Sequence, residues 1–201
     1  MSEKLTEIVL ATKNSHKVQE LNDMLMPLGI KVLATTELNK DISWVEDGET
    51  FEANSLIKAK AIRKFWGGAI LADDSGLCVD ALDGAPGIYS SRFAGEDASD
   101  KDNNKKLLSV LENEKDRTAK FVCCLCFLDK KNNIQYFNGA LEGSIAEDYA
   151  GEGGFGYDPI FIVRESNKHL ALYSAKDKNQ ISHRSNALQL FIKYLKDSGQ
   201  V

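Results

Sequence analysis

Residues 69–76 read Ala69-Ile70-Leu71-Ala72-Asp73-Asp74-Ser75-Gly76, a short apolar run that leads directly into two carboxylates. Such a run beside turn-forming residues is typical of a buried strand. Open α/β sheets bind ligands at the carboxyl ends of their strands, and side chains alternate along a strand. Asp73 and Asp74 are therefore expected to point to different sides. One could hold a magnesium ion or accept a proton from water while the other orients a lysine. A plain strand-to-turn junction is the alternative.

Strand and helix patterns alternate on both sides of this stretch. Apolar spacings of three and four predict helices, and short apolar runs predict strands. We expect strands at residues 8–11, 30–34, 69–72 and 160–163, and a hairpin of 121–128 with 134–137. We expect helices over 15–26, from Thr50 to about 66, around 107–111 with Asp100 or Asp102 as its cap, and after Ser182. The mixture predicts the α/β class with a mixed sheet.

Length and composition set the general class. A chain of 201 residues fits one domain or two closely joined lobes without a separable linker. No apolar run approaches the ~18 residues of a membrane span. The first seven residues lack the apolar segment of a signal peptide, so a cytoplasmic location is expected. The net charge of -5 argues against general nucleic-acid binding, although local lysines and a metal could still bind phosphate.

The four cysteines do not form a zinc pattern. Cys123, Cys124 and Cys126 lie in one apolar run, and Cys78 is separate. Zinc sites pair two clusters, or one cluster with histidines. We expect reduced cysteines that pack as small hydrophobic residues.

Residues 12–17 join the first strand to the first helix. A strand-to-helix junction directs free backbone N–H groups and the positive end of the helix dipole at one spot. Lys13 and Lys17 flank that spot, which suggests a polyphosphate cradle, although the loop lacks P-loop spacing. Two solvated lysines at a helix start are the alternative.

Two further charged positions could join the carboxylates. Asn54 and Lys58 are four residues apart on one predicted helix and share a face, so Lys58 could reach a phosphate or an aspartate. Glu46, on the preceding loop, could supply another carboxylate. An ordinary surface lysine is the alternative for Lys58.

Residues 151–156 match G-x-G-x-x-G, yet the dinucleotide interpretation is rejected. That motif must open a helix, and Pro159 followed by a strand excludes one here. A flexible loop that presents Phe155, Tyr157 and Asp158 fits better, with Phe155 stacked on a purine. A Gly-rich turn with Phe155 in the core is the alternative.

His183 and Arg184 follow Ser182 at the start of the last helix. Cations there oppose the helix dipole, which suggests that they serve as hydrogen-bond donors. A purine 6-oxo group accepts a hydrogen bond where the 6-amino group of adenine donates one, so such donors favour hypoxanthine. A solvated first turn is the alternative.

Together these motifs resemble the inosine triphosphate pyrophosphatase, or noncanonical purine NTP pyrophosphatase, family over nearly the whole chain. The most specific segments are Ala72–Leu77, Gly84–Ser90, Gly154–Pro159 and Ser182–Arg184. The resemblance implies a two-lobed α/β fold around a long twisted mixed sheet, with a nucleotide cleft between the lobes and a homodimer. It implies hydrolysis of ITP, dITP or XTP between the α- and β-phosphates to the monophosphate and pyrophosphate.

By position, the resemblance also implies roles for individual residues. Glu46 and Asp74 would hold Mg2+, and Asp74 would accept the proton of the attacking water with support from Asp73 and Lys58. Lys13 stands where the family commonly has a glycine or another small residue, and Ser15-His16 replaces a frequent Pro-Gly-type pair. The substrate would contact Thr12, Lys13, Asn14, Ser15, His16, Lys17, Ser75, Phe155, Gly156, Tyr157, Asp158, Lys178, His183 and Arg184.

Three other functions stay open at this point. One is a Maf-like pyrophosphatase of pyrimidine triphosphates, and another is a noncatalytic nucleotide-binding protein. The third is an unrelated hydrolase in which the Asp73-Asp74 pair supplies a covalent nucleophile.

Overall fold

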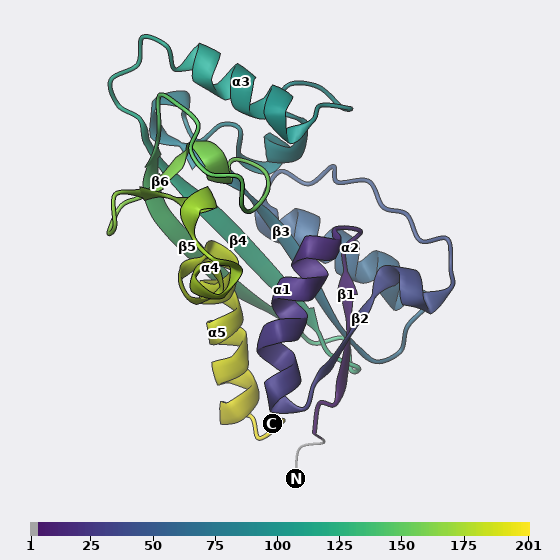
Figure 1. The fold of residues 1–201 in the computed structure, drawn as a ribbon. Coiled ribbons are helices and arrows are strands. Elements are labelled where there is room, and N and C mark those ends of the chain that lie inside the picture. The colour runs from purple at the N-terminus through teal and green to yellow at the C-terminus, as the bar shows by residue number, and fades with distance from the viewer. Residues whose placement is uncertain (1–3) are drawn as a thin grey trace. The chain divides into compact units, whose positions relative to one another are not determined.

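The computed structural model describes residues 4–201. The expectation about a signal peptide concerns the first seven residues, of which Met1 to Glu3 lie outside the described part. Within residues 4–201, seven strands form one sheet in the order β2-β1-β3-β4-β5-β6-β7. Figure 1 labels β1 to β6. Their bounds are β1 Glu7–Ala11, β2 Lys31–Ala34, β3 Ala69–Val79, β4 Thr118–Leu128, β5 Ile134–Ile145, β6 Phe161–Val163 and β7 Lys168–His169.

The sheet is mixed, as predicted. β1 pairs in parallel with β2 and with β3, while β5–β6 and β6–β7 are antiparallel. The parallel pairs need crossover connections, and helices supply them. The helices are α1 Ser15–Leu25, α2 Phe51–Arg63, α3 Asp100–Val110, α4 Ala175–Ile181 and α5 His183–Asp197. Short 3-10 turns are η1 Met26–Leu28, η2 Thr35–Leu38, η3 Asp80–Leu82, η4 Gly87–Arg92, η5 Asp158–Ile160 and η6 Leu170–Leu172.

The chain divides into two compact units. The first comprises residues 1–74, 124–138 and 187–201, and the second comprises 75–123 and 139–186. In the first, α2 packs on a core that includes Val9, Ile70 and Ala72. In the second, α3 and β4 to β6 surround a separate core that includes Leu77, Leu107 and Phe161.

Three boundaries differ most from the prediction. β5 does not end at Phe137 but continues to Ile145, with alternate residues buried. β3 does not end at Ala72 but continues to Val79, because Leu77 and Val79 are fully buried and continue the alternation beyond the carboxylates. The cap of α3 is Ser99 rather than Asp100 or Asp102, since its hydroxyl accepts from the backbone N–H of Asp102. The Asp102 carboxylate in turn accepts from the Ser99 backbone N–H, which completes a capping box.

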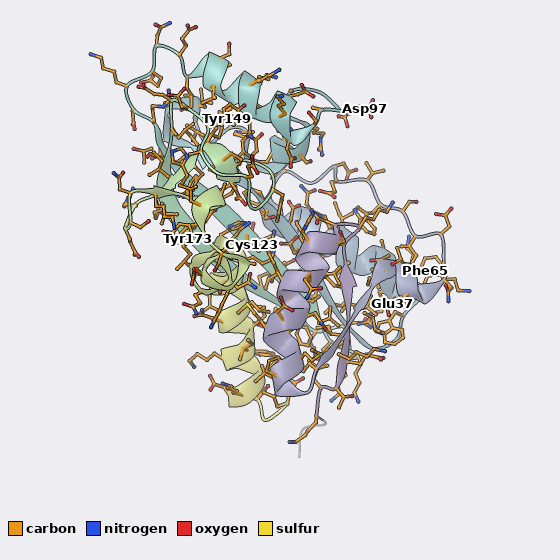
Figure 2. The ribbon with its side chains drawn as sticks, viewed as in Figure 1. Glu37, Phe65, Asp97, Cys123, Tyr149 and Tyr173 are labelled. Carbon is orange, nitrogen blue, oxygen red and sulfur yellow. The ribbon has the colours of Figure 1, made fainter. Side chains whose placement is uncertain are left out.

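All four cysteines are free thiols. Cys123, labelled in Figure 2, lies on β4 and is fully buried together with Cys124 and Cys126. Burial raises the pKa of the Cys124 and Cys126 thiols to about 12. The prediction that these cysteines pack as small hydrophobic residues is confirmed.

None of the helices formed by residues 4–201 combines the length and the apolar character of a transmembrane span.

Candidate active site

Asp73 and Asp74 lie where β1 stops pairing with β3. The parallel register runs from Ile8↔Ala69 to Ala11↔Ala72, so the carboxylates follow the last paired residue. Both side chains are buried. Ile70 and Ala72 pack in the same core cluster as residues of α2, and strand alternation places Asp74 on that face and Asp73 on the other. The carboxylates accordingly bind lysines of two different helices.

Lys58 of α2 binds three oxygens with one buried ammonium. Its Nζ lies 2.7 Å from Oδ1 of Asp74 and 3.2 Å from Oε2 of Glu46, and it donates to the backbone carbonyl of Asp73 at 3.0 Å. An ammonium has three N–H donors, so these contacts can use all of them. The predicted Asn54–Lys58 face is therefore buried, and Lys58 is not an ordinary surface lysine.

Burial and charge set the protonation of this group. Burial raises the pKa of Asp74 to about 6, although the Lys58 charge and hydrogen bond oppose the shift. Burial alone would lower the pKa of Lys58, but the charges of Asp74, Asp73 and Glu46 outweigh it, so its pKa is raised. At neutral pH the group therefore has an ammonium that stays protonated beside a carboxylate that can exchange a proton.

The loop before α1 brings a second lysine to the carboxylates. Lys17 forms an ion pair with Asp73 through Nζ and Oδ1. Asn14 caps α1, since its Oδ1 accepts from the backbone N–H of His16 at 2.9 Å and of Lys17 at 3.4 Å. The Thr12 hydroxyl accepts from the Asn14 backbone N–H at 3.1 Å. The predicted loop of Thr12, Asn14 and Lys17 thus lies beside the Asp73–Asp74 pair.

Other residues of this loop face solvent. Lys13, Ser15 and His16 are exposed. The ammonium of Lys13 lies 5.4 Å from the centre of the Trp44 ring, within the range of a cation–π contact.

Trp44 and Asn54 hold the loop that carries Glu46, and neither is among the site residues predicted from the sequence. Trp44 donates its indole N–H to Oε1 of Glu46 at 3.2 Å. Asn54 accepts from the Gly48 backbone N–H at 2.9 Å. A Cβ at Gly48 would lie 2.7 Å from the Asn54 Oδ1, so only glycine allows this approach. The sequence marks Asn54 only by its helical spacing from Lys58. Trp44 gives no periodic signal, because it lies in a loop.

The carboxylates of Asp74 and Glu46 have the chemistry of a site for one divalent ion. Within residues 4–201, no three His, Cys, Asp or Glu side chains come together as a complete metal centre. Magnesium commonly takes only one or two carboxylates and completes its shell with water and substrate phosphates. Oδ2 of Asp74 is buried and has no hydrogen-bond partner among the described residues. Asp74 and Glu46 therefore fit such an ion.

The second unit contains the residues predicted to bind the nucleoside. Oδ2 of Asp158 accepts from Nζ of Lys178 at 2.6 Å and from the Phe155 backbone N–H at 3.0 Å. Gly154 has a φ of +75°, and a Cβ there would lie 1.9 Å from Oδ2 of Asp158. The glycine-rich loop therefore wraps around a buried ion pair. It leads into a short 3-10 turn, which confirms the rejection of the dinucleotide motif.

Two cations lie against the Phe155 ring. Nζ of Lys178 is 4.5 Å and Cζ of Arg184 is 5.9 Å from its centre. Arg184 is almost fully buried and donates from Nη2 to the Ser75 hydroxyl at 3.3 Å. Ser75 follows Asp74 directly on β3. Phe155, Lys178, Arg184 and Ser75 thus form one contiguous group.

His183 is buried next to this group at the start of α5. Its ring stacks on Phe121, with the ring centres 4.9 Å apart and the planes 14° apart. Ser182 accepts from the Ser185 backbone N–H at 3.1 Å, as expected of the predicted cap. The side chains of His183 and Arg184 at this helix start are therefore buried, and the solvated first turn is excluded.

The side chain of Tyr157 was expected to be presented to a ligand, but it is buried in the protein core. It is 4% exposed, its ring belongs to the second core, and its hydroxyl donates to the Ser90 carbonyl at 2.8 Å. Burial raises the pKa of the phenol. The neighbouring Gly156 has its backbone N–H bound by the Asp100 carboxylate at 2.7 Å. Asp100 thus holds this loop rather than capping its own helix.

Two of the motifs behind the family resemblance contact each other. The Ser90 hydroxyl accepts from the Leu77 backbone N–H at 2.8 Å and donates to the Gly87 carbonyl at 2.6 Å. A Cβ at Gly76 would lie 2.2 Å from that carbonyl oxygen. The turn at residues 84–90 therefore packs directly on β3 beside Ser75.

Comparison with known proteins agrees with these motifs. The family model described as the Ham1 family matches residues 8–194. The dITP/XTP pyrophosphatase of an Exiguobacterium species is 46% identical over 183 residues, which cover 91% of this chain and 93% of the relative. The dITP/XTP pyrophosphatase of Bacillus subtilis is 42% identical over 193 residues, 95% of this chain and 98% of the relative.

The fold is similar to a solved Ham1 structure over the same span. The Staphylococcus aureus Ham1 protein aligns with a TM-score of 0.87 at 42% sequence identity, covering 96% of this chain and 99% of that chain. Family model, sequence relatives and fold agree over almost the full length. This chain therefore belongs to the Ham1 family.

Proposed function

We propose that this chain hydrolyses noncanonical purine nucleoside triphosphates, such as dITP, ITP and XTP, to the monophosphate and pyrophosphate. The observation that carries the proposal is the buried ammonium of Lys58, which contacts the carboxylates of both Glu46 and Asp74. The two relatives are dITP/XTP pyrophosphatases, which favours purine over pyrimidine triphosphates as substrates. An intact acidic group favours an enzyme over a noncatalytic binding protein.

We assign the divalent ion to Mg2+, held by Glu46 and Asp74. The buried Oδ2 of Asp74 supports this assignment, because no described protein group donates a hydrogen bond to it. When bound, the ion would neutralise phosphate charge and lower the pKa of a coordinated water. Lys58 contacts one oxygen of each carboxylate and so fixes the direction in which both face.

Asp74 then accepts the proton of the attacking water. General bases work best when their pKa lies close to the working pH, and in the ion-free protein burial raises the pKa of Asp74 to about 6. Lys58 keeps Asp74 oriented through their 2.7 Å contact. Asp73 is the positioning partner of Lys17 rather than a second base, since its carboxylate pairs with that ammonium.

The phosphates are assigned to the start of α1. The positive end of the helix dipole and the cation of Lys17 both favour negative charge there. The side chains of Thr12 and Asn14 order the loop through hydrogen bonds. Lys13, Ser15 and His16 remain exposed and are proposed to contribute from the outer side of the loop.

The base is assigned to the group in the second unit. Arg184 and Lys178 supply only donors, and His183 can supply one ring N–H, which match the 6-oxo acceptor of hypoxanthine and xanthine. Adenine presents a donor at the same position, so a buried donor of the protein would lose its partner. Phe155 supplies an aromatic face for the purine, and Asp158 fixes Lys178 at 2.6 Å. Ser75 and Gly156 complete the proposed contacts, whereas Tyr157 packs in the second core.

A panel of triphosphates tests the proposal, assayed with and without Mg2+ and with pyrophosphate as the measured product. dITP, ITP and XTP should be hydrolysed with Mg2+ and not with EDTA, and dATP and dCTP should be poor substrates. Release of orthophosphate instead of pyrophosphate would contradict the proposed bond of cleavage. An acid-stable phosphorylated protein would indicate the covalent alternative.

We further propose a homodimer in the cytoplasm. The free thiols are compatible with a reducing compartment, and free nucleotides are the expected substrates there. Light scattering coupled to gel filtration would measure the mass directly against the 22.2 kDa of one chain.

A further inference from the structure

Trp44 is a large aromatic residue in the loop between η2 and α2, where exposed residues alternate with buried or half-buried ones. The segment between η2 and α2 has no regular structure, and Val45 beside it is 75% exposed. Trp44 itself is half-buried and packs on the core beneath α2 together with Leu38 and Leu56. Its ring is therefore held by the first unit while its N–H edge remains available to the loop.

That N–H edge binds one oxygen of the Glu46 carboxylate. The indole Nε1 donates to Oε1 at 3.2 Å, while Oε2 lies 3.2 Å from Nζ of Lys58. A carboxylate on a loop can rotate about its side-chain bonds. Two donors on different oxygens, one from the loop and one from α2, define a single orientation for Glu46.

The face of the same ring carries a residue of the phosphate loop. The ammonium of Lys13 lies 5.4 Å from the ring centre, within the range of about 6 Å for a cation–π contact. Lys13 sits between Thr12 and Asn14, which order the start of α1. One indole therefore contacts both the loop assigned to phosphate and the carboxylate assigned to the metal.

We propose that Trp44 is a positioning residue that orients Glu46 for the divalent ion and joins the Glu46 loop to the phosphate loop through Lys13. This inference rests on the proposed function, because that function assigns Glu46 to the metal. Hydrogen bonds to metal-ligating carboxylates commonly tune metal affinity by one order of magnitude or more. Trp44 should therefore act on metal affinity and only weakly on turnover at saturating metal.

Trp44→Phe isolates the hydrogen bond, since phenylalanine retains an aromatic face for Lys13 but has no N–H donor. The concentration of Mg2+ that gives half-maximal dITP hydrolysis should rise roughly tenfold. kcat at saturating Mg2+ should stay within about twofold. Trp66→Phe is the matched control, because the Trp66 indole donates to the Ala69 carbonyl at 3.2 Å and not to the acidic group. This control should keep the wild-type Mg2+ dependence.

A second readout needs no turnover. The chain has two tryptophans, so Trp66→Phe leaves Trp44 as the single indole emitter. Titration with MnCl2, a paramagnetic ion, should quench its fluorescence in a saturable manner. Adding Glu46→Gln to the same background should abolish the saturable quench while thermal melting shows a folded protein.

The outcomes separate the two proposals. A Trp44→Phe variant with wild-type Mg2+ dependence, or a Trp44 signal that ignores Mn2+, would overturn the positioning role although dITP is hydrolysed. A saturable, Glu46-dependent quench in the Trp66→Phe background, together with a wild-type protein that hydrolyses no triphosphate, would overturn the proposed function and support the metal-positioning role. Loss of kcat in Trp44→Phe at every Mg2+ concentration would contradict positioning through the metal.

Discussion

Nζ of Lys58 lies 2.7 Å from Oδ1 of Asp74, and both side chains are buried. The two residues come from different elements, α2 and β3. This ion pair links α2 to the residues of β3 that follow the last pair with β1. Lys58 also contacts Glu46, so the two carboxylates share one ammonium.

Replacing Lys58 by methionine should reduce both activity and stability. The change removes the partner of a buried carboxylate, and breaking such a pair costs about 3 kcal/mol of unfolding free energy. Turnover of dITP should fall at least about a hundredfold, because Asp74 and Glu46 lose their common orientation. Urea denaturation and initial rates are the measurements.

Lys60→Met serves as the control for that variant. Lys60 is exposed on the same helix, so its removal should change stability by no more than about 0.5 kcal/mol. Equal losses of activity and stability in the two variants would mean that any substitution on this helix causes them, and that the ion pair does not.

The acidic limb of the pH–rate profile should depend on the Mg2+ concentration. The pKa of Asp74 is raised to about 6 by burial, so below that pH the metal-free protein carries it as the neutral acid. A metal ligand must be ionised, and the ion therefore competes with the proton. At low Mg2+ the rate should fall as pH drops through about 6, and rising Mg2+ should move this limb to lower pH. A limb that stays fixed from low to saturating Mg2+ would rule out Asp74 as a ligand.

Base selectivity should depend on His183 and Arg184. In either alanine variant, the ratio of kcat/KM for dITP over dATP should fall roughly 10- to 100-fold, because a donor for the 6-oxo group is removed. Arg164→Ala is the control, since Arg164 is largely exposed and pairs with Glu142. An unchanged ratio in both site variants would show that other groups recognise the base.

Gly76→Ala should destabilise the protein by about 2 kcal/mol, a typical cost of overpacking. The added Cβ would lie 2.2 Å from the Gly87 carbonyl oxygen and 2.6 Å from the Ser90 hydroxyl. Gly67→Ala, where nothing lies within 4 Å, should be nearly neutral. Chemical denaturation of both variants measures the difference, and similar stabilities would contradict the packing of the turn on β3.

The strands and longer helices could be predicted because their apolar spacing is regular. α1, α2 and α5 begin where capping residues and apolar periodicity indicated. The full length of β3 could not be predicted, since Asp73-Asp74-Ser75-Gly76 has the composition of a turn. Its continuation depends on tertiary packing, in which Leu77 and Val79 are buried and Gly76 contacts the following turn. The seven-residue α4 was missed because it is short and polar.

The site was partly predictable for a similar reason. Paired carboxylates after an apolar strand and a lysine on a half-apolar helix are local patterns, and both lie in the group around Lys58. Trp44 could not be found in this way, because its contacts join a loop to residues without fixed spacing. Tyr157 was expected to be presented to a ligand, but its ring fills the second core, which the glycine-rich sequence around it does not indicate.

The most direct test of the account is the rate of pyrophosphate release from dITP by Asp74→Asn at saturating Mg2+. The amide keeps the size of the side chain but cannot accept the proton of water, so kcat should fall by about 10³-fold. Thermal melting should show that the variant remains folded. Turnover within tenfold of the wild-type rate in this folded variant would contradict the proposal that the buried carboxylate at the end of the β1–β3 pairing performs the chemistry.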